Sequence, residues 1–155
     1  MNLESELKIE QVSHLNLSDF SRAESGTAVR GVLALLRAEG HNVCLVTESG
    51  RLVGIFTDRD ALRKATGVPN VLDGPIDDVM TRDPISIRPD VSAAEAMRIM
   101  DERRIRNLPV VDDAGNILGD MTHRAVIDYL AARYPVEVLN LPPELERFPR
   151  KQEGG

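Results

Sequence analysis

The residues best suited to chemistry lie in one short segment, Gly54-Ile55-Phe56-Thr57-Asp58-Arg59-Asp60. If a helix begins just after Thr57, its first backbone N–H groups are unpaired and carry the positive end of the helix dipole, which suits a phosphate group. The Thr57 hydroxyl can add a donor. The Asp60 carboxylate would repel phosphate, but it can accept two hydrogen bonds from a ribose diol. Gly54 permits close approach of a ligand.

The same residues have a purely structural interpretation. Thr57 and Asp60 have the spacing of a helix capping box, which stabilises a helix by about 1 kcal/mol without any ligand. The two roles are compatible, because the Thr57 hydroxyl can act as acceptor or donor. The local sequence leaves both open.

An internal repeat organises the chain around this segment. Val43–Gly54 aligns with Leu108–Gly119 at an offset of 65 residues, and no gap is needed in either direction. The same offset pairs Thr57 with Thr122 downstream and Asn42 with Asn107 upstream. A long period seen only twice indicates a duplicated domain half, not a solenoid.

Each copy predicts a helix before its first strand. Four apolar residues at helical spacing define one face in each copy. The first helix should end at Gly40, and the second should begin at a capping box made by Ser92 and Glu95. The two apolar faces are Val29, Val32, Leu33 and Leu36, and Ala93, Ala96, Met97 and Met100.

Two strands and a second helix should follow in each copy. The short apolar runs read as buried strands, and the polar turns that close on Gly50 and Gly115 lead into partner strands. Thr57 and Thr122 should then open helices that run toward Lys64 and Ala131. The expected strands are Val43–Val46, Arg51–Phe56, Leu108–Val111 and Asn116–Met121.

A further strand is expected at Pro84–Ile87, because Pro84 disfavours helix at Asp83, with its counterpart at Leu15–Phe20. The expected fold class is α+β: two βαββα repeats packed through their sheets with pseudo-twofold symmetry, since neither half alone can bury both faces of its strands. The expected division is an N-terminal extension (1–10), a first repeat (11–66), a linker (67–75), a second repeat (76–134) and a Pro-containing C-terminal tail (135–155).

With this order of elements, the Gly54–Asp60 segment and the Leu108-Pro109-Val110-Val111-Asp112 segment resemble the tandem CBS domain, or Bateman module, in its stand-alone form. The resemblance covers roughly residues 10 to 134. It implies a cleft between repeats that binds an adenosine-containing ligand such as AMP, ADP, ATP or S-adenosylmethionine. It also implies a disc-like homodimer and an unknown regulated protein. The family's nucleotide signature matches Gly54, Thr57 and Asp60 without departure.

The resemblance also implies ligand contacts at other positions. His41 and Asn42 would face phosphate, and Arg106 is a second phosphate candidate. The remaining candidates would surround adenine, although they are equally ordinary core or strand-edge residues. They are Pro84, Ile85, Ser86, Leu108 and Pro109.

The second repeat departs from the signature, since it reads Gly119-Asp120-Met121-Thr122-His123-Arg124-Ala125. Ala125 replaces the ribose-binding aspartate, and Asp120 replaces an apolar strand residue. Because an unpartnered buried carboxylate is costly, Asp120 should be paired or lie at an exposed edge. One competent nucleotide site is therefore expected, not two.

The composition excludes several other functions. Aromatic residues make up 3% of the 155 residues and tryptophan is absent, which argues against a base-stacking surface. The net charge of −6 disfavours nonspecific binding to nucleic acid or anionic membranes. The lone Cys44 fits a small core residue in a reducing compartment. Without a signal peptide or membrane-spanning run, the expected location is cytoplasmic.

No catalytic or metal site is expected. His14, His41 and His123 lie on separate segments without metal-ligand spacing, and there is no phosphate-binding loop motif. The favoured function is a regulatory, energy-sensing module that needs no cofactor and is not an enzyme. The alternative is a ligand-independent dimerisation or protein-interaction module, with Pro135–Gly155 as a docking strap.

Overall fold

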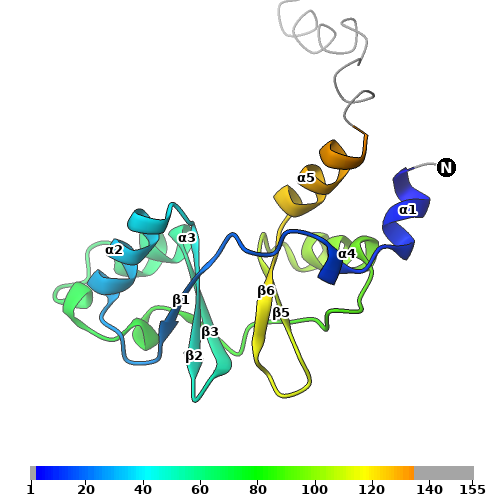
Figure 1. The fold of residues 1–155 in the computed structure, drawn as a ribbon. Helices are drawn as coiled ribbons and strands as arrows, with labels where there is room; N and C mark the ends of the chain where they lie inside the picture. Colours follow the sequence, from blue (N-terminus) through cyan, green and yellow to red (C-terminus); the bar gives the residue numbers. More distant parts are fainter. Residues whose placement is uncertain (1–2, 135–155) are drawn as a thin grey trace, which may run out of the picture.

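The first repeat forms a mixed sheet covered by one long helix, in a computed structural model that describes residues 3–134 (Figure 1). The helix buries the apolar face expected from its spacing, and Gly40 ends it in the left-handed conformation with φ of 71°. The tail at 135–155 lies outside the described residues. The elements are β1 (Ser21–Glu24), α2 (Val29–Glu39), β2 (Val43–Glu48), β3 (Arg51–Thr57) and α3 (Asp58–Asp60), continued by a π-helical turn (Ala61–Ala65).

The second repeat has the same order but a smaller sheet. Ser92 caps its first helix by accepting a hydrogen bond from the Glu95 N–H at 3.1 Å. In place of a first strand it has a single parallel bridge between Ile87 and Val110. Its elements are α4 (Ala93–Arg103), β5 (Leu108–Val111), β6 (Ile117–Met121) and α5 (His123–Arg133).

The segment that leads into each repeat crosses to the other repeat. β4 (Thr81–Arg82), which precedes the first helix of the second repeat, pairs with β3 of the first repeat and completes the sheet β1-β2-β3-β4. Correspondingly, the carbonyl of Leu17, which precedes the first strand and helix of the first repeat, accepts a hydrogen bond from the Asp120 N–H in β6 at 2.9 Å. Leu17 and Arg82 are 65 residues apart. The exchange is therefore reciprocal, as expected of two halves related by a pseudo-twofold axis.

The two sheets pack against each other beside this crossing, where β3 and β6 lie side by side (Figure 1). Val43 and Leu45 of β2 form a buried cluster with Ile117 of β6. The backbones also meet, since the Leu52 N–H donates to the Gly115 carbonyl at 3.1 Å. Each repeat has its own aliphatic core under its helix. The expected α+β fold with repeats packed through their sheets is thus confirmed.

Two expected strands are wrong. The strand at Leu15–Phe20 is absent, and the first strand begins only at Ser21. The residues before Ser21 instead cross to β6, which removes them from the first repeat's own sheet. Of the strand expected at Pro84–Ile87, only the bridge at Ile87 forms, because the chain is still crossing between the repeats.

The helix expected from Thr57 to Lys64 forms only in part. It begins at Asp58 as expected but changes to π-helical geometry at Ala61. Its Leu62 side chain is 75% exposed. Because this segment buries little apolar surface, packing does not enforce a regular α-helix.

The N-terminal extension contains a helix, α1 (Leu3–Ile9), which packs beside α4 (Figure 1). Its buried Glu6 accepts hydrogen bonds from Tyr134 and Tyr129 and pairs with Arg133. The hydrogen bond from Tyr134 is the main reason that the pKa of Glu6 is lowered. Across the described residues, no helix is both long and apolar enough to span a membrane.

Candidate functional site

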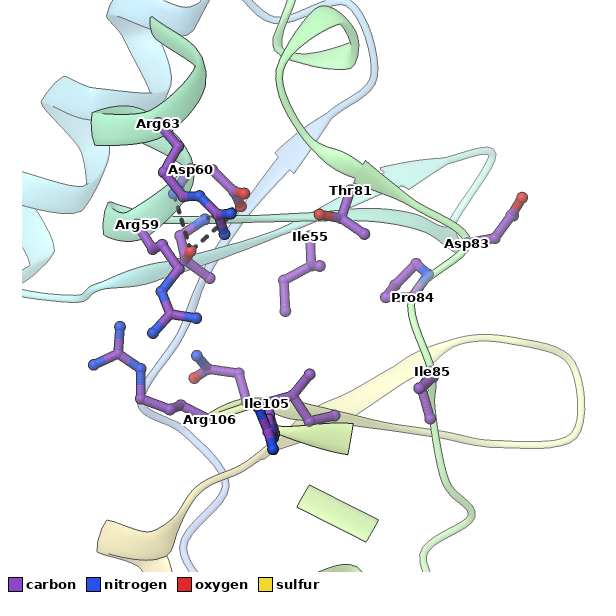
Figure 2. Close-up of a pocket in the computed structure, with 13 residues that line it drawn as sticks. Ile55, Arg59, Asp60, Arg63, Thr81, Asp83, Pro84, Ile85, Ile105 and Arg106 are labelled. Carbon is purple, nitrogen blue, oxygen red and sulfur yellow. Dashed lines mark hydrogen bonds between the residues drawn. The ribbon is translucent and has the colours of Figure 1, made fainter. Parts of the chain in front are cut away.

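A cleft of about 340 Å³ opens between the repeats, a volume within the usual range of small-molecule sites (Figure 2). The first repeat, the crossing segment and the second repeat each supply part of its wall. They contribute, respectively, Ile55, Thr57, Arg59, Asp60 and Arg63; Thr81, Asp83, Pro84 and Ile85; and Arg104, Ile105, Arg106 and Asn107.

The capping box is formed at the base of this cleft. Asp60 Oδ2 accepts hydrogen bonds from the Thr57 N–H at 3.0 Å and from the Thr57 hydroxyl at 3.3 Å. In return, the Asp60 N–H donates to the Thr57 hydroxyl at 3.4 Å. Asp60 Oδ1 lies 3.6 Å from Lys64 Nζ, and the Asp60 side chain is 14% exposed. Oδ1 thus retains acceptor capacity, and Asp60 is one of the residues that line the cleft.

The cleft has an apolar end and a cationic end. Figure 2 shows Pro84 and Ile85 at the right, with Ile55 projecting into the centre. Arg59 and Arg63 lie at the left, beside Asp60. A ligand lying along the cleft would have its apolar part against isoleucine and proline and its anionic part among arginines.

The arginines come from both repeats. Arg106 Nη2 lies 3.8 Å from Asp58 Oδ1, in an ion pair that is mostly exposed. Within residues 3–134, the side chains of Arg59, Arg63 and Arg104 have no hydrogen bond or ion pair. Their guanidinium donors are therefore available to a ligand.

Only some of the residues expected in the site line the cleft. Thr57, Asp60, Pro84, Ile85 and Arg106 line the cleft. The others expected there do not line it: Gly54, Ser86, Leu108, Pro109, His41 and Asn42.

Gly54 has a packing reason for being glycine. A Cβ at this position would collide with the Met80 side chain, where the crossing segment approaches β3. Leu108 and Pro109 are buried in β5, and Ser86 is exposed. The space that Gly54 leaves is therefore filled by the Met80 side chain of the protein itself and not by a ligand.

His41 and Asn42 line a second hollow of about 440 Å³. This hollow also contains Thr122 and Arg124, which correspond in the repeat to Thr57 and Arg59. It is therefore the pseudo-twofold counterpart of the cleft. The His41 ring is already engaged, because Nδ1 lies 3.0 Å from the Ser21 hydroxyl.

Asp120 lies in β6 near this second hollow and contradicts the expectation. It is 1% exposed, and neither carboxyl oxygen has a hydrogen-bond partner among residues 3–134. Burial, with a smaller contribution from Asp19, raises the pKa of Asp120 well above its ordinary value. The expectation that Asp120 is paired or exposed is therefore wrong. The raised pKa favours the protonated carboxyl group, and protonation avoids the cost of burying a charge.

Sequence reasoning missed several residues of the cleft. Arg59 and Arg63 are four residues apart, which places them on one face of a helical turn, and this spacing could have been noticed. Arg104 gave no such signal, because its run of charges resembles an ordinary solvated helix end. The other missed residues are Ile55, Thr81, Asp83, Ile105 and Asn107.

The other reactive side chains of the described region are not gathered into a site. No group of three or more His, Cys, Asp or Glu residues between 3 and 134 could hold a metal ion. Cys44 is fully buried, and burial raises its pKa to about 12, which keeps its thiol protonated. Its role as a small core residue is confirmed.

The fold and cleft define a class of protein: a pair of βαββα repeats with ligand-sized hollows between them. The CBS domain family model matches residues 18–67 and 76–132. The chain belongs to the CBS domain family.

The chain is similar to part of a longer enzyme. It is 40% identical over 82 residues to inosine-5′-monophosphate dehydrogenase of Nitrosopumilus maritimus, which covers 53% of this chain and 16% of the dehydrogenase. The chain thus spans about a sixth of that relative's length.

Two solved structures share the fold. Crystal structures of CBSX2 in complex with AMP and of the CBS domain pair of protein MJ0100 in complex with 5′-methylthioadenosine and S-adenosyl-L-methionine superpose with TM-scores of 0.67 and 0.68. They are 21% and 23% identical to this chain. The matches cover 79% and 81% of this chain and 97% and 98% of theirs.

Proposed function

We propose that this chain is a regulatory CBS pair that binds an adenine nucleotide or another adenosyl compound in the cleft between its repeats. The observation that carries the proposal is the order of groups along the cleft. Apolar side chains lie at one end, and arginines lie at the other end beside the partly free Asp60 carboxylate. A nucleotide has the same polarity, with its base at one end and its ribose and anionic group toward the other.

Each group has a defined role in this proposal. Ile55, Pro84 and Ile85 would enclose the base, and Asp60 Oδ1 would accept hydrogen bonds from the ribose hydroxyls. Arg106 would bind the anionic group. The adenosine compounds named in the CBSX2 and MJ0100 structures support this assignment.

The regulatory role follows from the fact that both repeats contribute residues to the wall of the cleft. Thr57 and Asp60 belong to the first repeat, whereas Ile105 and Arg106 belong to the second. A ligand that contacts both repeats binds best in one relative placement and shifts the population toward it. The signal would pass to a regulated partner protein without any reaction on the ligand.

Thermal denaturation of the full chain with AMP, ADP, ATP and S-adenosylmethionine tests the proposal. A ligand at about 100 times its Kd should stabilise the fold by about 2.7 kcal/mol. The variant Asp60→Asn keeps a side-chain acceptor for the cap but loses the charge. It should weaken binding roughly tenfold, since a hydrogen bond to a charged group is worth about 1.5 kcal/mol or more.

The matched control is Asp113→Asn, whose fully exposed side chain pairs with Arg88 away from the cleft. This control should bind like the unaltered chain. If none of the four compounds raises the midpoint, the sensor proposal is wrong.

A dimerisation module is the second candidate function, and one observation favours it. Leu62 and Ile127, 65 residues apart, are 75% and 59% exposed. They occupy the same position in the two repeats, on the helical segments that follow β3 and β6. Sedimentation of the double variant Leu62→Ser with Ile127→Ser tests a homodimer, which should dissociate if these residues form its contact.

A further inference from the structure

The cleft concentrates positive charge in an acidic chain. Four arginines line it, Arg59, Arg63, Arg104 and Arg106, against two aspartates, whereas the whole chain has a net charge of −6. One of the two aspartates, Asp60, is already engaged by Thr57 and Lys64. The cleft thus carries a local excess of positive charge that attracts anions.

Three of these four arginines have no ion pair within residues 3–134, and the fourth, Arg106, has only a long, exposed one with Asp58. The three are Arg59, Arg63 and Arg104. Arg98, by contrast, binds Glu95 and Glu102 at 2.7 Å and 2.6 Å. Gathering like charges without counterions is unfavourable, and a bound polyanion relieves it through charge-assisted hydrogen bonds.

Arg104 occupies a backbone position that suits glycine better. It follows α4 in the left-handed conformation, with φ of 56° and ψ of 43°. The first repeat ends α2 with Gly40 in the same conformation, with φ of 71°. Side chains disfavour this region, and strained residues of this kind cluster at functional sites. The strain places a guanidinium group on the cleft wall.

The number of donors exceeds what one phosphate can use. A monophosphate carries at most about two negative charges at pH 7, which one or two arginines neutralise. Each guanidinium has several N–H donors in a planar fork, so four of them suit a chain of phosphates. S-adenosylmethionine would bring a positive sulfonium toward the same arginines.

We infer that the ligand of this cleft is a nucleoside di- or triphosphate, held through its β- and γ-phosphates by Arg59, Arg63, Arg104 and Arg106. This inference rests on the proposed function for the base and the sugar. It adds that the phosphate chain selects the ligand.

Calorimetric titration of the full chain tests the inference with ATP, ADP, AMP, adenosine, S-adenosylmethionine and inorganic tripolyphosphate. We expect ATP and ADP to bind at least tenfold more tightly than AMP, with adenosine and S-adenosylmethionine weaker still. ATP affinity should fall steeply as salt rises, because exposed charges are screened.

Three variants separate ligand contact from folding. Arg63→Ala should weaken ATP at least fivefold while changing adenosine binding less than twofold. Arg104→Gly should weaken ATP similarly without lowering Tm, because glycine relieves the left-handed backbone. The control Arg37→Ala removes another exposed arginine, at the end of α2, that has no ion pair within the described region, and it should leave ATP affinity unchanged.

The outcomes distinguish this inference from the proposed function. Equal affinity for AMP and ATP, or no effect of the two cleft variants, overturns the phosphate-chain inference and leaves an adenosine site in place. Tripolyphosphate binding that depends on Arg63, with no gain from adenosine, supports the phosphate contacts but overturns the adenine site. Binding of none of the six compounds overturns both.

Discussion

Asp60 and Asp120 are both located near the end of the second strand of their repeat, but their carboxyl groups have opposite surroundings. Asp60 is surrounded by donors, namely the Thr57 N–H and hydroxyl and the Lys64 ammonium group. Asp120 is buried with no partner in the described region, and its pKa is raised mainly by burial. The first aspartate can therefore accept hydrogen bonds from a ligand, whereas burial favours the protonated form of the second.

The raised pKa of Asp120 predicts a stability that falls with pH. Between the ordinary pKa of the unfolded chain and the raised pKa of the fold, only the folded state keeps the proton. The stabilising contribution is complete below the unfolded pKa, near 4, and is lost as pH rises through the folded pKa. Asp120→Asn cannot ionise and should raise the free energy of unfolding at pH 8 by roughly 1–2 kcal/mol.

Urea denaturation of this variant at pH 5 and pH 8 provides the measurement. The gain should be smaller at pH 5, where the unaltered Asp120 is protonated in a larger fraction of folded molecules. Asp113→Asn, which is exposed, serves as the comparison and should show no such difference. An equal gain at both pH values would mean that Asp120 does not titrate differently in the folded and unfolded states.

The helices that follow β3 and β6 start alike and continue differently. Both have a threonine cap, but only the first has an aspartate to complete the box. At the second, the Thr122 hydroxyl accepts a hydrogen bond from the Ala125 N–H at 3.1 Å. That helix nevertheless runs regularly from His123 to Arg133, because Ala125 and Val126 are buried in the core. Packing, more than the cap, decides how far each helix extends.

The cap of α5 still contributes stability. Thr122→Ala removes the side-chain acceptor at its start and should lower the free energy of unfolding by about 1 kcal/mol. Thr122→Ser keeps an acceptor and should lie close to the unaltered chain. Chemical denaturation of both variants measures the difference, and equal stability of the alanine and serine variants would refute the role of the hydroxyl.

The whole molecule is held together by chain segments that each repeat receives from the other. Leu17 lies along β6 and Arg82 lies along β3, in positions related by the repeat. Glycines at the equivalent positions 54 and 119 leave room for these crossings. The cleft exists because the crossing brings Pro84 and Ile85 past the wall formed by Thr57 and Asp60.

The two crossings differ in how well they would tolerate an added Cβ atom at the neighbouring glycine. A Cβ at Gly119 would lie 2.9 Å from the Leu17 carbonyl oxygen, so backbone must move, whereas the three atoms nearest to a Cβ at Gly54 all belong to the flexible Met80 side chain. Gly119→Ala should therefore destabilise the fold by roughly 2 kcal/mol and Gly54→Ala by about half as much or less. Parallel urea denaturation of the two variants measures this order, which a greater loss at Gly54 would contradict.

Much of the architecture was predictable because it depends on local spacing. The long helices followed from apolar residues three and four apart, and the cap at Thr57 from a box within four residues. The strand expected at Leu15–Phe20 was wrong because its pairing partner lies in the other repeat. Of the site, Thr57 and Asp60 were visible as a motif, whereas Arg104 was not, since nothing near it in sequence marks the cleft.

The sequence alone determined that the chain is a duplication, where most of the helices and strands of each copy lie and which copy has an aspartate, Asp60, in its capping box. Periodicity and turn residues encode these features within a few residues of one another. Only the tertiary structure decided that the entering segments change partners, that four arginines from two repeats share one cleft and that Asp120 is buried without a partner among residues 3–134. Those outcomes depend on contacts between residues far apart in the chain, which no local pattern records.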